Sequence, residues 1–140
     1  MKKLFLLLSI FSIIIHADIL INKDATKKLC ETVMQSVANN QMKKGLEELR
    51  PYSIIPKSEF NVQFSQLDMQ MPIITKRFGK AIGYDFINKK EIGTTLIQYI
   101  YLQKFEKHAM VWHFLFYKPK NKWLLNAWYF DDNIKGLFKD

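Results

Sequence analysis

Hydrophobic residues in the first half of the chain recur at intervals of three and four, the spacing of one helical face. The positions that form this stripe are Ala25, Leu29, Cys30, Val33, Met34 and Val37. They predict a helix that Asp24 caps and that ends at Asn39-Asn40. Met42, Leu46 and Leu49 continue the spacing in a shorter helix, which Gly45 weakens and Pro51 stops.

A third helix is predicted after the connector at residues 51–56. Ser58 is its expected N-cap, and Gly79 is its expected terminator. Pro72 should kink this helix near its middle. Its apolar face steps by three and four through Phe60, Phe64, Leu67, Met71, Ile74 and Phe78.

After Gly79 the pattern changes to runs of β-branched and aromatic residues with short polar breaks. We predict strands at 81–88, 92–106, 110–118 and 123–131, with turns at 88–91, 107–108 and 119–122. Gly93 is expected to allow a bend or bulge where the second strand starts. A short helix or tail is expected over 134–138. The fold class is therefore α+β, with N-terminal helices packed on a curved, roughly four-stranded antiparallel sheet.

The last two predicted strands are apolar on both faces. Trp112, Phe114 and Phe116 alternate with Val111, Leu115 and Tyr117. A strand that is apolar on both sides must be covered on both sides. Since the helices of so small a domain can cover only one face, we expect a homodimer formed through the other, open sheet face.

The first 17 residues have the layout of a secretory signal peptide. A positive start, Met1–Lys3, precedes an apolar stretch from Leu4 to Ile15, and cleavage is expected between Ala17 and Asp18. About 20 apolar residues are needed to span a bilayer, so this stretch is too short for a stable membrane span. We expect a single mature domain, residues 18–140, in the bacterial periplasm or secreted beyond it. A retained N-terminal anchor remains the alternative.

The chain carries a formal net charge of +8, but its lysines are scattered instead of clustered. This distribution, together with export, argues against a nucleic-acid partner. Cys30 is the only cysteine and lies among apolar residues of the first helix, so we expect a buried structural thiol.

Helices followed by a long, bent antiparallel sheet resemble the nuclear-transport-factor-2-like superfamily. The resemblance covers nearly all of the mature chain and rests on Phe78-Gly79-Lys80, Gly83-Tyr84, residues 112–118, Trp123-Leu124-Leu125 and residues 129–132. It implies a cone-shaped pocket fold in which helices plug a curled sheet. Because this superfamily includes isomerases, hydrolases, secretion-system subunits and non-catalytic binding domains, the resemblance selects no single activity.

Catalytic chemistry has few candidates among the predicted strands. A small hydrolase or isomerase would use His113 or Asp85 with a tyrosine. No strand, however, places a carboxylate at mid-length among inward aromatic residues. Only His108 and His113 could bind a metal in the mature chain, and neither has a cysteine nearby, so no metal or cofactor is expected.

The preferred interpretation is an exported, non-catalytic binding or assembly module of the bacterial envelope. It would hold a small apolar or amphipathic ligand, or a peptide, between aromatic walls. The ligand-binding residues predicted on this basis are Tyr99, Tyr101, Trp112, His113 and Trp128. Strand parity separates them, because Trp112 and His113 must point to opposite faces. Use of the open sheet face by a different envelope protein is the third hypothesis.

Overall fold

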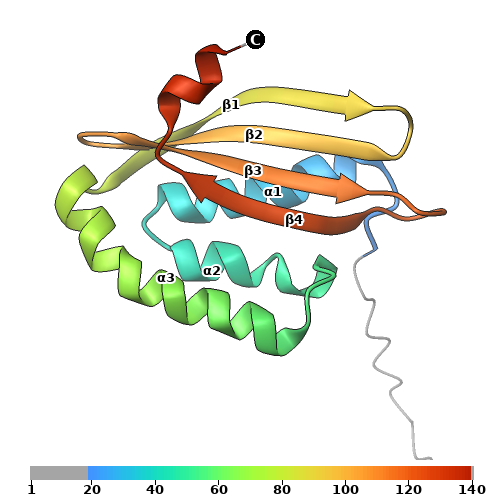
Figure 1. Cartoon of the computed structure of the whole chain (residues 1–140), viewed down its shortest axis with the longest axis horizontal. Coiled ribbons are helices and arrows are strands. Elements are labelled where there is room, and N and C mark those ends of the chain that lie inside the picture. The colour runs from blue at the N-terminus through green and yellow to red at the C-terminus, as the bar shows by residue number, and fades with distance from the viewer. Residues whose placement is uncertain (1–18, 140) are drawn as a thin grey trace, which may run out of the picture.

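A computed structural model describes residues 19–139, so the predicted signal peptide lies outside the described residues. Helices come first and strands follow (Figure 1). The helices are α1 (Lys23–Ala38), α2 (Met42–Glu47), the 3₁₀ turn η1 (Arg50–Tyr52) and α3 (Lys57–Phe78). The strands are β1 (Ala81–Ile92), β2 (Leu96–Phe105), β3 (Ala109–Tyr117) and β4 (Leu124–Asp131), followed by the 3₁₀ turn η2 (Ile134–Phe138). The predicted α+β fold class is confirmed.

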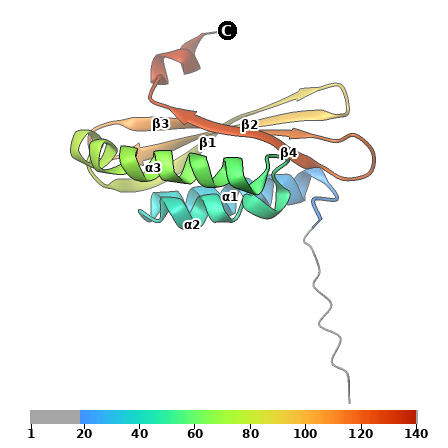
Figure 2. The same cartoon turned by 60° about the horizontal axis from the view of Figure 1, so that its bottom comes forward.

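The four strands form one antiparallel sheet in the order β1-β2-β3-β4. Every strand therefore pairs with its neighbour in sequence. Two extra residues in β1, Ile82 and Ile87, and one in β4, Asn126, shift the register and produce bulges. In Figure 2 the helices lie on one side of the sheet and η2 on the other. We call the side without the helices the open face.

The hydrophobic core lies between the sheet and the helices. Alternate residues of β2 and β3 point toward α1 and are fully buried, among them Tyr99, Tyr101, Trp112, Phe114 and Phe116. The apolar stripe of α1 packs against them, and Cys30 is 0% exposed within it, as predicted. Burial raises the pKa of the Cys30 thiol well above its ordinary value, which keeps the thiol neutral. The core therefore fills the side on which a cone-shaped pocket was expected.

The predicted N-cap positions of two helices are each wrong by two residues. Asn22, not Asp24, caps α1, and its side-chain oxygen accepts the backbone N–H of Ala25 at 2.8 Å. Asp24 lies instead in the first turn, where its charge favours the helix dipole. Helix α3 begins at Lys57 after Pro56, without a side-chain cap, so Ser58 has no capping role. Gly79 ends α3 as predicted, with φ of 81°.

The first hairpin turn also lies elsewhere than predicted. Residues 88–91 continue β1, and the chain turns at residues 93–95, where Gly93 has φ of 56°. The polar run that suggested a turn forms a surface ion-pair group instead. The Glu91 carboxylate lies 2.6 Å from Lys23 Nζ and 2.7 Å from Lys89 Nζ. These lysines lower the Glu91 pKa to about 2.

Candidate ligand-binding groove

Four of the five predicted ligand-binding residues lie on the helix side of the sheet. Tyr99, Tyr101 and Trp112 are at most 1% exposed and belong to the packed core. Trp128 is partly buried against Phe60 of α3, with ring centroids 5.9 Å apart. His113 lies on the open face, as strand parity required. The structure does not bring the five residues into one pocket.

Buried hydrogen bonds connect several of these aromatic residues to the rest of the core. The Trp112 indole donates to Gln103 Oε1 at 2.9 Å, and Gln103 Nε2 donates to the Val37 carbonyl at 3.0 Å. This chain joins β3, β2 and α1. The Tyr99 hydroxyl donates to the Lys23 carbonyl at 3.1 Å. These contacts show structural roles for Trp112 and Tyr99.

The Tyr101 hydroxyl, by contrast, is buried without a hydrogen-bond partner. Removing it in Tyr101→Phe is expected to leave the free energy of unfolding unchanged or to raise it by about 1 kcal/mol, because no bond is lost. The matched change Tyr99→Phe removes a satisfied hydroxyl and should lower stability by about 1 kcal/mol. Urea unfolding of both variants measures the difference. An equal loss in both would show that Tyr101 has a bonding partner in solution.

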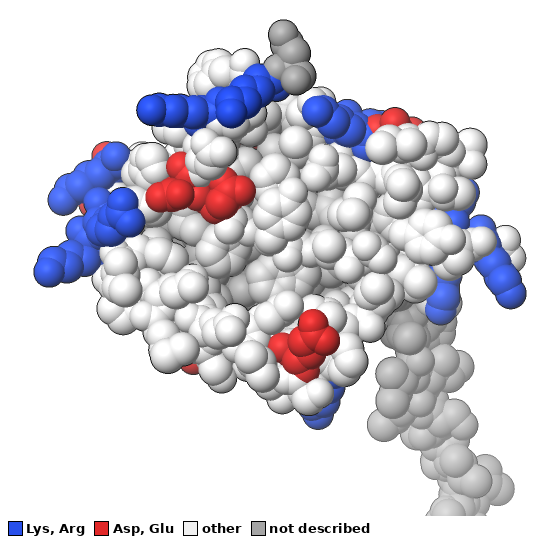
Figure 3. Space-filling model, in the orientation of Figure 1, with Lys and Arg blue, Asp and Glu red and all other residues white. Residues whose placement is uncertain are grey.

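The open face carries a groove of about 430 Å³ near the C-terminal turn. Figure 3 views this face, where uncharged side chains form most of the middle, Lys and Arg lie mainly toward the rim, and two acidic groups lie within the face. We call this hollow the open-face groove. Its lining residues are Ile87, Asn88, Lys90, Gln98, Ile100, Val111, His113, Tyr129, Asp131, Asn133, Gly136, Leu137 and Lys139.

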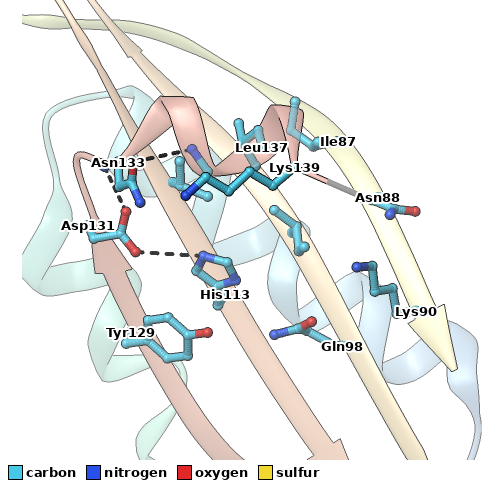
Figure 4. A pocket seen from close by; sticks show the side chains of 13 residues that line it. Ile87, Asn88, Lys90, Gln98, His113, Tyr129, Asp131, Asn133, Leu137 and Lys139 are labelled. Atoms are coloured by element: carbon cyan, nitrogen blue, oxygen red, sulfur yellow. Dashed lines mark hydrogen bonds and ion pairs between the residues drawn. The ribbon is translucent and has the colours of Figure 1, made fainter. Parts of the chain in front are cut away.

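The floor of the groove is apolar and its upper wall is the turn η2. Ile100 and Val111 are 8% and 1% exposed, although no helix covers them. Side-chain caps hold the turn in place over them. Asn133 Oδ1 accepts the Gly136 N–H at 3.2 Å, and Asp131 Oδ1 accepts the Asn133 N–H at 2.8 Å (Figure 4). The C-terminal residues thus cover part of the face that was expected to be open.

Two lysines reach the groove without an ion pair. Lys90 comes from β1 and Lys139 follows η2, so they approach from different elements (Figure 4). Neither ammonium group lies within salt-bridge distance of a carboxylate in the described chain. Asp131 is the carboxylate that lines the groove, and its Oδ1 already accepts a backbone N–H. A polar group that carries negative charge would therefore find unpaired cations here.

His113 forms part of the groove beside Tyr129. Its ring stacks on the tyrosine ring with centroids 4.4 Å apart and planes 12° apart. His113 Nε2 lies 3.8 Å from Asp131 Oδ2, which is longer than a hydrogen bond, and Nδ1 is buried without a partner. Burial lowers the pKa of His113, and the Asp131 charge opposes that shift. Burial therefore favours the neutral form of the imidazole.

This neutral histidine predicts a specific pH dependence. Because the unfolded chain binds the proton at a pKa of about 6.5 and the folded chain at a lower pKa, protonation favours unfolding. The stability contribution is thus present above pH 6.5 and falls as the pH drops below it. We expect wild-type protein to lose stability relative to His113→Gln between pH 7.5 and 5.5, as measured by urea unfolding. A gain relative to the variant would show that Asp131 stabilises the imidazolium.

Asp85, the other candidate of the enzyme hypothesis, lies apart from His113. It is exposed on β1, and Lys104 Nζ lies 3.1 Å from its Oδ1. Asp85 pairs across from Leu102 and His113 across from Ile100, so strand β2 separates them. Within residues 19–139 no three His, Cys, Asp or Glu side chains are grouped to hold a metal ion. No helix in this range is long and apolar enough to cross a membrane.

Most residues of the groove were missed by the sequence analysis. The sequence places Lys90 in a predicted turn, and it does not single out Gln98, Tyr129 or Lys139 as site residues. The available signal was strand parity. Val111, His113 and Leu115 share one face of β3, and their β2 and β4 partners extend that face.

Comparison with known proteins gives no relative. No protein-family model, curated protein or solved structure matches the chain at a significant level. The resemblance to the nuclear-transport-factor-2-like superfamily therefore stays a prediction.

Proposed function

We propose that the protein is a non-catalytic binding module that holds a small amphipathic molecule in the open-face groove. The observation that carries the proposal is the combination of an apolar floor with two unpaired lysines at the groove. At about 430 Å³ the groove lies within the usual size range of small-molecule sites. An apolar body would cover Ile100 and Val111, and an anionic head would face Lys90 and Lys139.

The environment of His113 favours binding over catalysis. A general base needs a ring nitrogen within reach of the substrate proton. Here Nδ1 is enclosed, and Nε2 is directed to Asp131 at 3.8 Å. His113 stacked on Tyr129 therefore suits a wall of the groove, where a flat ligand group can pack. A hydrolase or isomerase using His113 or Asp85 with a tyrosine stays the alternative.

A second copy of the chain is the rival occupant of the same face. Beyond the groove the open face continues through Ile92, Leu96, Leu115 and Tyr117, and Ile92 is 70% exposed. Such a patch favours self-association. The homodimer remains a prediction, and Leu115→Lys is the substitution that should disrupt it without touching the helix side.

We also propose that the protein acts outside the cytoplasm after cleavage near Ala17. The mass of the chain purified from the bacterial envelope, with Asp18 as first residue, would support this location. Full-length chain in the cytosol would contradict it.

The ligand proposal is tested with two probes of equal chain length and opposite charge. Sodium decanoate is expected to bind more tightly than decyltrimethylammonium in calorimetric titrations of the mature protein. Lys90→Glu combined with Lys139→Glu should weaken decanoate binding by about fivefold or more, given about 1 kcal/mol for an exposed ion pair. Lys120→Glu, in the exposed loop before β4, is the matched control and should have no effect.

Native mass spectrometry of the same sample separates the rival uses of this face. A retained small molecule on a monomer supports the proposal. A dimer without ligand that Leu115→Lys dissociates, or equal binding of both amphiphiles, would overturn it.

A further inference from the structure

The outer edge of β4 borders a second hollow, which shares only Tyr129 with the lining of the open-face groove. This hollow, the β4 slot, has a volume of about 200 Å³ and lies between β4 and α3. Its lining residues are Gln63, Gln66, Leu67, Gln70, Trp128, Tyr129 and Phe130. The last three are consecutive, and side chains of consecutive strand residues point to opposite faces. The main chain at the strand edge must therefore form one wall of the slot.

This edge is unpaired where it borders the slot. Between Asn126 and Asp131, no backbone hydrogen bond from another described segment reaches the outer side of β4. At Leu125, just before this unpaired stretch, the edge of β4 already pairs with another segment as it would with a neighbouring strand. Ser53 forms a parallel bridge with Leu125, and the Ile54 N–H donates to the Leu125 carbonyl at 3.2 Å. The edge of β4 thus already pairs with an added segment at Leu125, and the part of the edge beyond Leu125 is left unpaired.

Two buried polar atoms at the slot lack a partner. The Trp128 indole nitrogen is a donor, and Gln63 Oε1 is an acceptor, and neither forms a hydrogen bond. Buried polar groups are nearly always paired, so each unpaired one needs an explanation. Gln66 and Gln70 add two further amides on the same side of α3. The indole N–H can donate a hydrogen bond to a peptide carbonyl, and the glutamine amides can both donate to and accept from peptide main-chain groups.

We infer that the β4 slot binds an extended, uncharged peptide segment of another protein, which adds to the sheet as a fifth strand. Main-chain groups of the peptide would pair with the edge of β4 beyond Leu125, continuing the direction of Ser53–Ile54. The glutamine amides and the Trp128 indole would bond its side-chain or outward main-chain groups. This is the mode in which an exposed sheet edge recognises an extended peptide.

The chemistry of the slot selects this occupant. No charged residue lines it, which disfavours a charged segment. The repeating N–H and C=O groups of a strand edge match a peptide main chain better than the hydroxyls of an oligosaccharide. The opposite edge, β1, carries Lys89 and Lys90 beside a bulge, which are devices that discourage strand addition. Peptide addition is therefore expected at β4 alone.

The experiment selects peptides from a random library by display against the mature protein, then examines the tightest uncharged binder. Nuclear magnetic resonance should show shifts of the Trp128 indole N–H and of the Gln63, Gln66 and Gln70 side-chain amides. The same peptide with alternate backbone nitrogens methylated should bind at least about tenfold more weakly, since it loses two or more main-chain bonds. Gln66→Lys should also weaken binding, and Gln35→Lys, at an exposed position on α1, should not.

Three results would overturn the inference. One is a peptide that binds as tightly after methylation of its odd-numbered backbone nitrogens, and after methylation of its even-numbered ones, as it does without methylation. Another is binding whose resonance shifts lie outside the slot. The last is a set of slot shifts produced by cellohexaose, with no selected peptide producing them. These measurements do not report on Lys90 or Lys139 of the open-face groove. If the peptide proposal fails, the small-molecule proposal can therefore still be tested separately.

Discussion

Replacing Trp112 with alanine is expected to lower the free energy of unfolding by about 3–5 kcal/mol. The side chain is 0% exposed, and its ring packs on Phe114 and Phe130 with centroids 6.0 and 4.7 Å away. The substitution leaves a cavity and also leaves Gln103 Oε1 without its donor. Small domains are stable by about 5–15 kcal/mol, so much of the total is lost. Urea unfolding followed by far-ultraviolet circular dichroism measures the loss.

Two variants separate the causes of that loss. Trp112→Phe keeps most of the packing and removes the donor, so it should cost about 1–3 kcal/mol. Trp128→Ala changes the same residue type on the next strand, where the ring is only partly buried, and should cost less than Trp112→Ala. A loss below about 1 kcal/mol for Trp112→Ala would mean that the helix side of β3 is not packed as described.

Replacing Gly45 with leucine is expected to lower the free energy of unfolding by about 2–3 kcal/mol. Gly45 is buried where α2 crosses α1, and a Cβ atom there would lie 3.0 Å from the Val33 carbonyl oxygen. It would also lie 3.2 Å from Ser36 Cβ and 3.3 Å from a methyl carbon of Val37. Because these three atoms belong to α1, a leucine side chain at position 45 fits only if α2 moves away from α1. Thermal and urea unfolding report the change.

Lys44→Leu is the matched control, because it places the same side chain one position away on the exposed side of α2. A surface change of this kind should stay within about 0.5 kcal/mol of wild type. Equal losses in the two variants would contradict a close approach of α1 and α2 at Gly45.

The sequence was a good guide to the fold where burial sets the pattern. The apolar stripes of α1 and α3 face the core as predicted. It was a poor guide where exposed residues decide the geometry. Asn88–Glu91 is polar enough for a turn, but these residues pair with Ile97–Ile100 of β2 and continue the edge strand β1. The cap of α1 was missed because Asn22 precedes the periodic residues by three positions.

The candidate groove could be predicted only in part. His113 and the two-sided character of β3 were recognised, yet the aromatic residues that seemed suited to a ligand fill the core. The groove depends on the turn η2 folding back over Val111, a tertiary contact with no local sequence signal. Lys90 and Lys139 are far apart in sequence and line the same groove only in the folded chain. Periodicity reports which face is buried, but not which distant segments border the same hollow.

The strand order has a consequence for which contacts are costly to form during folding. Each strand pairs with the next along the chain, across connections of a few residues, so the sheet is built from contacts of low sequence separation. The N-terminal segment differs, since the Trp123 N–H donates to the Leu20 carbonyl at 2.8 Å and Thr26 meets Tyr99 across 73 positions. The entropy of closing long loops therefore falls on the helical half of the chain, both on α1 and the residues before it and on the segment from Ser53 to Phe60 that reaches β4. The C-terminal half of the fold is therefore built mainly from local contacts, whereas the N-terminal half joins it through contacts of long sequence separation.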